Sequence, residues 1–528
     1  MKSPFIIATR GSDLALWQAN HVKALLEAIG LKSELKIIKT QGDVVQHLSL
    51  DKLEGKGFFT KEIEDALLRN EADIAVHSHK DLPTESPADL QIAAVTNRED
   101  PAELLIIRKE CVDARQKFSL KKNAVVGTSS ARRKSQLLAF RKDVELKDLR
   151  GNVPGRVKKL RDSQYDAILL ASAGIERLEL NLDDLHVEKL DPHEFIPAPA
   201  QGVMAIQIRK DDQELFEALQ KINKKDVQQQ IAIERKILNL FEGGCHAPVG
   251  AFAEYDDDKE VWKVIAAKAD TWDKLPISVY LESKNQDTLA ERAVERIHSV
   301  KPASVFITRN VKDDDYFKSV LIANGFEVIG RSLIEFAKIP LKYFPETDWI
   351  FFSSKHAVIY FFLQKPELQN QKFGCIGKST ADEIRKFGKR AEFIGTSTDT
   401  RLTGKQFASR VGNGTVLFPM AKGSLRSIQN GFVKAEQVID LPVYETLEHN
   451  EEKISPTDIL VFTSPSNVQS FLKANRIDKK QKLVALGEAT GSTLRKSGFA
   501  QYILPDAFDD TALARAVFSI SALKDAGL

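Results

Sequence analysis

Cysteine is scarce in this chain of 528 residues, which has Cys111, Cys245 and Cys375 alone. An odd and widely spaced set excludes the disulfide framework on which small secreted domains depend. Long apolar runs are also missing, because none approaches the roughly 20 residues that a membrane-spanning helix needs. The first residues contain too few apolar side chains before Thr9 and Arg10 to form a signal peptide. We therefore expect a cytoplasmic protein without a membrane partner.

An excess of one charge is absent as well. The chain has 76 basic and 74 acidic residues, which gives a formal net charge of +2. A general nucleic-acid binder carries a marked basic excess, so no nucleic-acid partner is expected, although a local basic cleft is compatible with this balance. The length exceeds the roughly 250–300 residues at which a single core stops growing, so we expect several folding units.

Short apolar runs alternate with amphipathic stretches along most of the chain. Strands are predicted at residues 5–8, 73–76, 125–126 and 166–170, and a helix at residues 14–29. This order is typical of βαβ units and predicts a multidomain α/β protein with largely parallel sheets. Ligands of such sheets bind at the carboxyl ends of the strands, so chemistry is expected in the loops there.

The C-terminal part contains an internal repeat. Asp348 and Asp458 each open a strand-like run that ends in adjacent hydroxyl side chains, and Ile376-Gly and Leu486-Gly each open a second hydroxyl-containing motif. Both pairs are separated by 110 residues. The spacing predicts two duplicated α/β lobes whose strands end in hydroxyl-rich turns. These hydroxyls either bind an anion or only cap the helices that follow, which is their commonest role.

Five polar clusters lie at or near the ends of strands in the first half of the chain. Arginine is the side chain best suited to a bidentate grip on carboxylates or phosphates. Arginines that converge on one cleft would bind a ligand with several negative charges, whereas each taken singly could be a surface residue. The clusters are Thr9–Ser12, His77–Pro83, Gly127–Arg133, Leu149–Arg156 and Gly243–His246, and their arginines are Arg10, Arg132, Arg133, Arg150 and Arg156.

Two reactive side chains stand out in these clusters. Asp81 follows Lys80, and a carboxylate among cations stays ionised and can stabilise a cationic intermediate or handle protons. The alternative for Asp81 is a loop-capping role. Cys245 follows two glycines, which leave room for another group to approach. Its thiol could be a nucleophile or attachment point, a buried apolar side chain or, with His246, a metal ligand, but no further spaced ligands support a metal site.

The order of these motifs resembles the porphobilinogen deaminase (hydroxymethylbilane synthase) family over roughly residues 4–300. The resemblance implies two lobes like those of periplasmic binding proteins and a smaller α+β lobe that carries the cysteine. Their expected bounds are residues 1–97 with 196–214, residues 98–195, and residues 215–300. The motifs are Ala8-Thr-Arg-Gly-Ser-Asp-Leu-Ala-Leu-Trp-Gln-Ala, Gly55-Lys-Gly-Phe-Phe-Thr-Lys-Glu, His77-Ser-His-Lys-Asp-Leu-Pro, Arg98-Glu-Asp-Pro, Gly127-Thr-Ser-Ser-Ala-Arg-Arg, Leu149-Arg-Gly-Asn-Val and Glu242-Gly-Gly-Cys.

The same resemblance implies a reaction and a cofactor. Porphobilinogen units would be joined into linear hydroxymethylbilane with loss of ammonia, on a dipyrromethane cofactor that Cys245 holds through a thioether. Asp81 matches the catalytic aspartate, and the many cations suit a growing chain in which every pyrrole carries carboxylates. The residues matched to the cofactor are Ser78, Lys80, Asp81, Thr128, Ser129, Ser130, Arg132, Arg133 and Cys245, and those matched to the substrate are Arg10, Ser12, Lys56, Arg150, Arg156 and Gln201.

Three positions depart from the pattern of this family. Ala200 stands where the family usually has Gly before Gln201-Gly202, Glu54 replaces a common Gly, and His47 stands where Asp is usual. None of the three belongs to the catalytic set. They leave open the loop geometry and the details of cofactor contact.

The C-terminal repeat resembles uroporphyrinogen-III synthase over roughly residues 303–528. That family has two α/β lobes joined by a two-stranded connector, here expected at residues 303–337 with 446–528 and residues 340–443, and closes hydroxymethylbilane with inversion of its last pyrrole. Tyr444 matches the tyrosine proposed to assist loss of the hydroxyl, and Ser353, Ser354, Thr463, Ser464 and Thr490 match carboxylate binders. The motifs are Val305-Phe-Ile-Thr-Arg, Phe352-Ser-Ser-Lys-His-Ala-Val, Ile376-Gly-Lys-Ser-Thr-Ala, Leu441-Pro-Val-Tyr-Glu-Thr, Phe462-Thr-Ser-Pro-Ser-Asn-Val and Leu486-Gly-Glu-Ala-Thr.

The sequence thus predicts a bifunctional enzyme of tetrapyrrole (haem) biosynthesis, a monomer that acts on porphobilinogen and hydroxymethylbilane. One alternative keeps the deaminase and makes the C-terminal half a degenerate module. Another is a non-catalytic bilobed receptor for polycarboxylates. A third is a hydrolase that uses Cys245 and His246, although adjacent side chains point poorly at one another for a nucleophile and its base.

Overall fold

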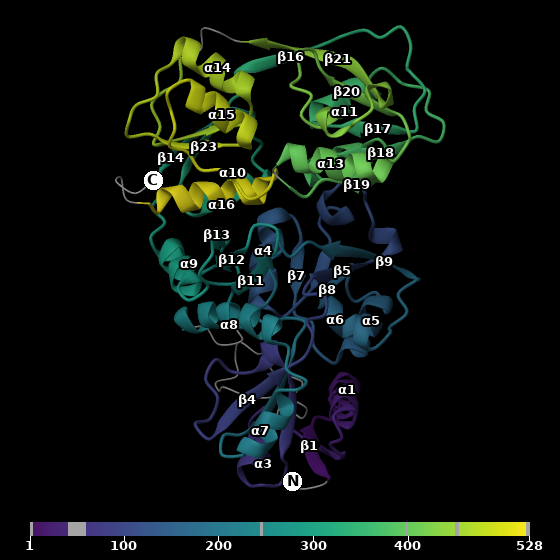
Figure 1. Ribbon diagram of the computed structural model, residues 1–528, viewed down its shortest axis with the longest axis vertical. Coiled ribbons are helices and arrows are strands. Elements are labelled where there is room, and N and C mark those ends of the chain that lie inside the picture. The colour runs from purple at the N-terminus through teal and green to yellow at the C-terminus, as the bar shows by residue number, and fades with distance from the viewer. Residues whose placement is uncertain (1–3, 41–59, 243–246, 398, 449–452, 524–528) are drawn as a thin grey trace. The chain divides into compact units, whose positions relative to one another are not determined.

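The computed structural model describes residues 4–40, 60–242, 247–397, 399–448 and 453–523 (Figure 1). Contacts divide the chain into two compact units, Met1–His298 and Ser299–Leu528. Each unit is a mixed α/β structure, and the two are described separately below.

The first lobe of unit 1 is a five-stranded sheet in the order β2-β1-β3-β10-β4. Helix α1 begins at the N-cap Ser12, and its buried face packs on the sheet through Ala19, Val22 and Leu26. Helix α7 adds Leu215 and Leu219 to the same core. The elements are β1 (Phe5–Thr9), α1 (Asp13–Ala28), β2 (Ser33–Ile37), α3 (Lys61–Leu68), β3 (Ile74–Ser78), β4 (Leu90–Val95), β10 (Met204–Arg209) and α7 (Gln213–Leu219).

The second lobe is a five-stranded sheet in the order β7-β6-β8-β5-β9. Its helices follow the strand ends directly: α4 begins after β6, and α6 begins after β8. Buried Leu105, Val126 and Leu169 form one side of its core. The elements are β5 (Glu103–Arg108), β6 (Val125–Gly127), α4 (Ala131–Phe140), β7 (Glu145–Lys147), α5 (Val153–Arg161), β8 (Ala167–Ala171), α6 (Ser172–Arg177) and β9 (Leu185–Leu190).

Both sheets are largely parallel, as predicted, but each contains one strand that runs against its neighbours. Strand β10 runs antiparallel to β3 and β4, and β5 runs antiparallel to β8 and β9. The cause is that the chain crosses between the lobes twice. Strands β4 and β9 each end where the chain leaves a lobe, and β5 and β10 each begin where it enters one. Strand β10 therefore runs opposite to β4, and β5 runs opposite to β9.

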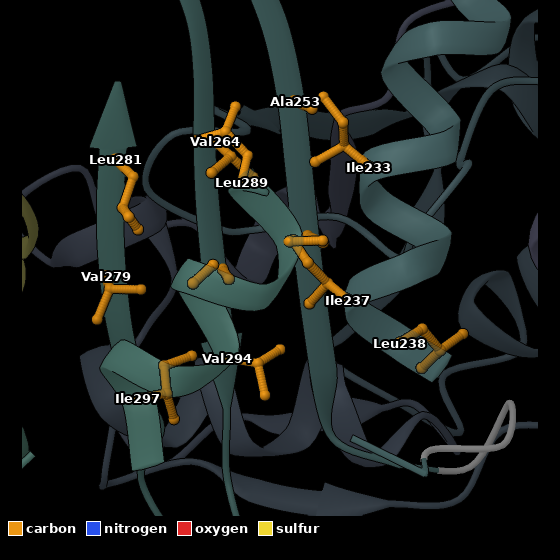
Figure 2. Close-up of a cluster of buried hydrophobic side chains, with 14 of the residues drawn as sticks. Ile233, Ile237, Leu238, Ala253, Val264, Val279, Leu281, Leu289, Val294 and Ile297 are labelled. Atoms are coloured by element: carbon orange, nitrogen blue, oxygen red, sulfur yellow. The ribbon is translucent and has the colours of Figure 1, made fainter. Parts of the chain in front are cut away.

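The third lobe packs a three-stranded antiparallel sheet, β11-β12-β13, against helices α8 and α9. Figure 2 shows Ile233 and Ile237 of α8 and Val294 and Ile297 of α9 on the same side of that sheet. Cys245 and His246 fall in residues 243–246, outside the described residues. The elements are α8 (Lys225–Leu240), β11 (Val249–Asp256), β12 (Val261–Lys268), β13 (Ile277–Ser283) and α9 (Leu289–His298).

A buried carboxylate fastens the third lobe to both crossings. Glu234 of α8 is fully buried and accepts two hydrogen bonds from Arg98, at 2.7 and 3.1 Å. It also accepts from the backbone N–H groups of Ala200, at 2.7 Å, and Ala253, at 2.9 Å. One side chain therefore joins the first crossing, the second crossing and strand β11.

Ala200, the departure from the family pattern, adopts the left-handed backbone conformation that favours Gly. Its φ is +63° and its side chain is fully buried. Glycine there would relieve about 1–2 kcal/mol of strain. It would also lose roughly 0.8 kcal/mol for the buried methyl and about 0.4–1 kcal/mol through added freedom of the unfolded chain. We expect the opposing effects to cancel, so that Ala200→Gly changes the free energy of unfolding by under about 1 kcal/mol in urea titrations.

Unit 2 contains two sheets. The first lobe of this unit is the parallel sheet β15-β14-β22-β23, and the second is the six-stranded sheet β16-β21-β20-β17-β18-β19. Strands β16 and β21, at the crossings between the lobes, form the one antiparallel pair among the described strands of unit 2. The strands are β14 (Ser304–Ile307), β15 (Glu327–Gly330), β16 (Ile334–Lys338), β17 (Trp349–Phe352), β18 (Lys372–Cys375), β19 (Ala391–Ile394), β20 (Val416–Ala421), β21 (Val438–Glu448), β22 (Ile459–Phe462) and β23 (Lys482–Ala485).

The repeat of 110 residues is present in the structure as two copies of one β-α-β-α motif. Asp348 accepts hydrogen bonds from the N–H and hydroxyl of Thr415, and Asp458 accepts the same pair from Ser304. The copies are β17-α11-β18-α12 and β22-α14-β23-α15, and the helices of unit 2 are α10 (Tyr316–Ala323), α11 (Lys355–Phe362), α12 (Lys378–Lys386), α13 (Thr400–Val411), α14 (Pro465–Ala474), α15 (Glu488–Lys496) and α16 (Asp510–Ser521).

Candidate functional site

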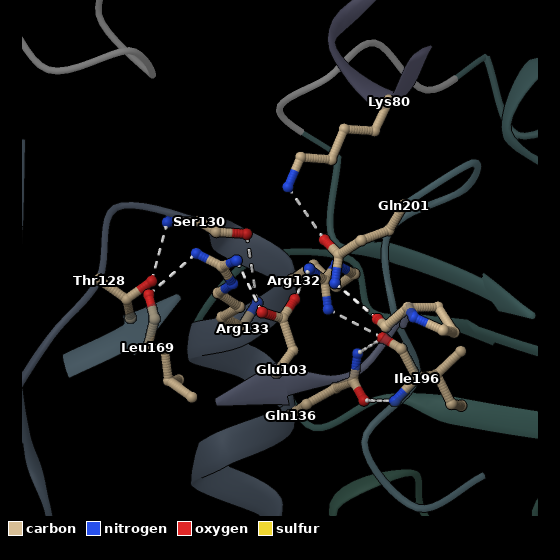
Figure 3. Close-up of polar contacts among 11 residues, drawn as sticks. Lys80, Glu103, Thr128, Ser130, Arg132, Arg133, Gln136, Leu169, Ile196 and Gln201 are labelled. Carbon is tan, nitrogen blue, oxygen red and sulfur yellow. Dashed lines mark hydrogen bonds and ion pairs between the residues drawn. The ribbon is translucent and has the colours of Figure 1, made fainter. Parts of the chain in front are cut away.

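The turn from β6 into α4 carries three adjacent hydroxyl side chains. Ser130 is the N-cap of α4 and accepts from the N–H of Arg133 at 3.4 Å. Thr128 accepts from the N–H of Ser130 at 3.3 Å, and Ser129 exchanges two 3.0 Å hydrogen bonds with the backbone of Leu149. Each hydroxyl thus shapes this turn, which holds the first residues of α4 at the end of the strand; Figure 3 shows Thr128 and Ser130.

The two arginines that follow this turn share one acid. Arg132 donates to Glu103 at 2.5 Å and Arg133 donates to its other carboxylate oxygen at 2.7 Å (Figure 3). The same arginines donate to the carbonyls of Ile196, at 2.8 Å, and Leu169, at 3.0 Å. Burial favours the neutral acid, but the two guanidinium groups outweigh it and hold the pKa of Glu103 far below its usual range.

Lys80 and Asp81 lie on a short 3-10 turn, His79–Asp81, directly after β3. The Lys80 ammonium donates to the side chain of Gln201 at 3.1 Å, and Gln201 in turn donates to the carbonyl of Pro101 at 2.8 Å. Burial lowers the pKa of Lys80 to about 8, a change that Asp81 and Glu103 oppose and that Arg133 and Arg132 reinforce. Lys80 of the first lobe is therefore within electrostatic range of the arginine pair of the second.

Two further predicted arginines belong to the same cluster. The Nη2 atom of Arg150 is buried and finds no hydrogen-bond partner among the described residues. Arg156 donates to the carbonyl of Gly151 at 2.7 Å, and burial together with Arg133 lowers its pKa to about 10 while Asp81 opposes that change. The structure thus brings together Lys80, Asp81, Arg132, Arg133, Arg150 and Arg156.

Sequence reasoning missed two charged residues of this region. Glu103 lies in an apolar strand, and Arg177 lies in a short helix without a motif. Arg177 pairs with Glu99 at 2.5 Å, donates to the carbonyl of Gly202 at 3.1 Å, and has its guanidinium 5.7 Å from the ring centre of Trp17. Asp81 acts electrostatically on it. No local pattern would have distinguished either residue, because their partners are distant in sequence.

The remaining predicted residues of unit 1 have other surroundings. Ser12 caps α1 by accepting from Ala15 at 3.4 Å, Ser78 accepts from Gln18 at 2.8 Å, and Arg10 is half-buried just before that cap. Lys56, Glu54, His47 and Cys245 lie outside the described residues.

In unit 2 Tyr444 lies on β21 among other rings. It is buried, stacks on Tyr360 at 5.4 Å between ring centres, and meets Phe336 edge-on at 5.3 Å. Its hydroxyl is 3.2 Å from that of Ser354, the N-cap of α11. Burial raises the pKa of Tyr444, so its hydroxyl stays protonated at neutral pH.

The other predicted hydroxyls of unit 2 sit at strand ends. Ser353 precedes the cap at Ser354, and Ser464 caps α14 by accepting from Asn467 at 3.2 Å. Thr463 donates to the carbonyl of Thr308 at 3.1 Å, and Thr490 donates to the carbonyl of Leu486, just before α15, at 3.2 Å. These contacts are structural, and Ser464 also accepts from the Asn467 side chain at 3.0 Å, as Thr463 does at 3.2 Å.

No helix within the described ranges of the chain is long and apolar enough to cross a membrane.

Three family models match the chain. Residues 5–217 match "Porphobilinogen deaminase, dipyromethane cofactor binding domain", and residues 228–274 match "Porphobilinogen deaminase, C-terminal domain". Residues 315–515 match "Uroporphyrinogen-III synthase HemD".

Curated relatives of the first half are porphobilinogen deaminases. The enzyme of Nitratiruptor is 41% identical over 290 residues, which are 55% of this chain and 91% of that protein. The probable porphobilinogen deaminase of Methanocaldococcus jannaschii is 45% identical over 261 residues, 49% of this chain and 86% of that protein. Among solved structures, uroporphyrinogen-III synthetase of Helicobacter pylori aligns with 40% of this chain and 97% of its own, at 18% identity and a TM-score of 0.30.

Proposed function

We propose, since this chain belongs to the porphobilinogen deaminase family and continues into a uroporphyrinogen-III synthase domain, that the charged cluster of unit 1 and the Tyr444 region of unit 2 are its two active sites. The chain joins four porphobilinogen molecules into hydroxymethylbilane with release of ammonia and then cyclises that product to uroporphyrinogen III with inversion of the last ring. It is therefore both a hydroxymethylbilane synthase and a uroporphyrinogen-III synthase.

The residues of the charged cluster suit a dipyrromethane cofactor. Its ring carboxylates need cationic donors, and the buried Nη2 of Arg150, the Lys80 ammonium and the Arg156 guanidinium supply them. Cys245 would hold the cofactor through a thioether. When bound, the cofactor supplies the pyrrole to which the first substrate is attached. The donor set of this chain, with more cations than acids at one place, is the observation that carries the proposal.

Asp81 would act on the incoming porphobilinogen. The substrate loses its amino group as ammonia, which leaves a cation spread over the pyrrole ring and its exocyclic carbon. A carboxylate that accepts a hydrogen bond from the pyrrole N–H stabilises that positive charge. Lys80 and Arg156 interact electrostatically with Asp81, so the cations that would bind the substrate carboxylates lie beside the acid that would face the pyrrole N–H.

One incubation tests both activities at once. The purified chain is given porphobilinogen alone, the product is oxidised, and the uroporphyrin isomers are separated. We expect mostly isomer III. Mostly isomer I would mean that unit 1 releases hydroxymethylbilane and that unit 2 fails to close it, and it would support the alternative of a degenerate C-terminal module. No uroporphyrin at all would contradict the assignment of unit 1.

We propose that the Tyr444 hydroxyl assists departure of the hydroxyl from hydroxymethylbilane. Tyr444→Phe should therefore lower the rate of enzymatic cyclisation by about three- to tenfold, the value of one neutral hydrogen bond. The measurement is the ratio of isomer III to isomer I. Tyr360→Phe is the matched control, because it removes a neighbouring hydroxyl that donates to the Phe336 carbonyl at 2.8 Å. Equal ratios in the two variants would contradict the role of Tyr444.

A further inference from the structure

Glu103 occupies a special position in unit 1. It is the first residue of β5, at the end of the first crossing between the lobes, and its side chain is fully buried. Its two carboxylate oxygens are taken by Arg132 and Arg133 at 2.5 and 2.7 Å. A buried acid with two guanidinium partners is held in place by charge-assisted hydrogen bonds, which are the strongest kind that side chains form.

The arginine pair depends on this acid for its position. Arg132 and Arg133 are themselves buried, and their other partners among the described residues are the neutral carbonyls of Ile196 and Leu169. Without Glu103 two cations would remain buried side by side with no opposite charge in contact. Such uncompensated buried charges strongly destabilise a folded protein. The pair would then move toward solvent or toward the next available anion.

Glu103 also acts on the neighbouring cation of the first lobe. The charged groups that face Lys80 are Asp81 from its own turn, Glu103 from β5, and Arg132 and Arg133 from α4. The two acids favour the charged ammonium, whereas burial and the two arginines favour the neutral amine. Glu103 is the acid of the second lobe whose negative charge opposes the effect of Arg132 and Arg133 on Lys80.

We propose that Glu103 is a positioning residue of the deaminase: it fixes Arg132 and Arg133 at the site and is, with Asp81, one of two acids whose negative charge acts on Lys80. The inference rests on the proposed role of Lys80 in binding pyrrole carboxylates. The pairing with Glu103 also gives the cations of the cluster different roles. Arg132 and Arg133 shape the site and are neutralised in part, so Lys80, Arg150 and Arg156 are left to meet the carboxylates of the substrate.

The test compares Glu103→Gln with the wild-type chain across pH. For the wild type, kcat/KM for porphobilinogen should be full below the Lys80 pKa of about 8 and should fall as pH rises through it, because the neutral amine does not hold a carboxylate. In Glu103→Gln the value at neutral pH should fall about ten- to hundredfold. The alkaline limb should also move to lower pH, because one of the two acids that favour the ammonium is gone.

Glu145→Gln is the matched control, since Glu145 is an exposed acid of the same lobe; its profile should equal that of the wild type. Glu103→Asp keeps the charge but is one methylene shorter, so its alkaline limb should stay in place while KM rises. If Glu103→Gln does not fold, judged by circular dichroism, Glu103→Asp decides: an unchanged KM and dipyrromethane content would overturn the proposal.

The two possible failures can be told apart. A wild-type profile without an alkaline limb near the pKa of Lys80 would contradict the role of Lys80 in carboxylate binding. If folded Glu103→Gln has its alkaline limb at the same pH as the wild type, the inference about Glu103 is overturned and the role of Lys80 stays intact.

Discussion

Asp81→Asn should lower kcat for porphobilinogen consumption by about 10²–10⁴-fold, the range over which one acid–base or charge-stabilising group acts. Asparagine fills the same volume and still accepts a hydrogen bond from a pyrrole N–H. It lacks the negative charge that would offset the cation formed when ammonia leaves. The effect should therefore appear in kcat more strongly than in KM, because the charge develops after the substrate has bound.

The chain provides its own control for this variant. Cyclisation of added hydroxymethylbilane takes place in unit 2 and should proceed at the wild-type rate in Asp81→Asn. Asp89→Asn, at an exposed position of the same lobe, should leave both activities unchanged. A deaminase rate within about threefold of the wild type would show that Asp81 only caps its loop.

Gly202→Ala should destabilise unit 1 by about 3 kcal/mol and abolish most deaminase activity. Gly202 has a φ of +89°, and a Cβ built on it would lie 2.3 Å from the carbonyl oxygen of Glu99. Glu99 belongs to the other crossing segment, and its own N–H donates to the Gly202 carbonyl at 3.1 Å. The added methyl would push the two crossings apart and shift Gln201, the partner of Lys80.

Gly30→Ala separates the backbone cost from the steric one. Gly30 has a similar φ of +83°, and apart from Gly30 itself and its two neighbours in the chain, no heavy atom of the described residues lies within 4 Å of its Cβ position. It should cost only about 1 kcal/mol, the penalty of a left-handed conformation for Ala. The measurement is the midpoint of calorimetric unfolding together with porphobilinogen consumption. Equal losses in the two variants would contradict the clash at the crossing.

Much of the site could be predicted from sequence because its parts are local. The hydroxyl turn of Gly127–Ser130 follows a short apolar run and precedes an amphipathic one, so a strand, a turn and a helix were expected in that order. The repeat in unit 2 could be read from spacing alone, since equal separations of Asp348 and Asp458 and of their flanking motifs need no knowledge of packing.

Glu103 and the direction of β5 and β10 could not be predicted in this way. A strand buried on both faces has the same apolar pattern whether it runs parallel or antiparallel to its neighbours. The partners of Glu103 are Arg132 and Arg133, which lie 29 and 30 positions further along the chain. Nothing in the sequence around Glu103 indicates that it contacts them. What is fixed by tertiary contacts between distant segments is invisible to motif and periodicity.

The double crossing between lobes has a consequence for the order in which the chain can fold while it is being made. All five strands of the second lobe lie between Glu103 and Leu190, so its sheet can close as soon as that stretch has left the ribosome. The first lobe waits for β10 at Met204–Arg209, which fills the gap between β3 and β4. Unit 2 repeats the pattern, because β14 must await β22 at Ile459–Phe462 until the whole six-stranded sheet has been synthesised. In each unit the strands of the inserted lobe are therefore all synthesised before the other lobe has its last strand. The lobe whose first strand is synthesised first is thus the one whose sheet is completed last.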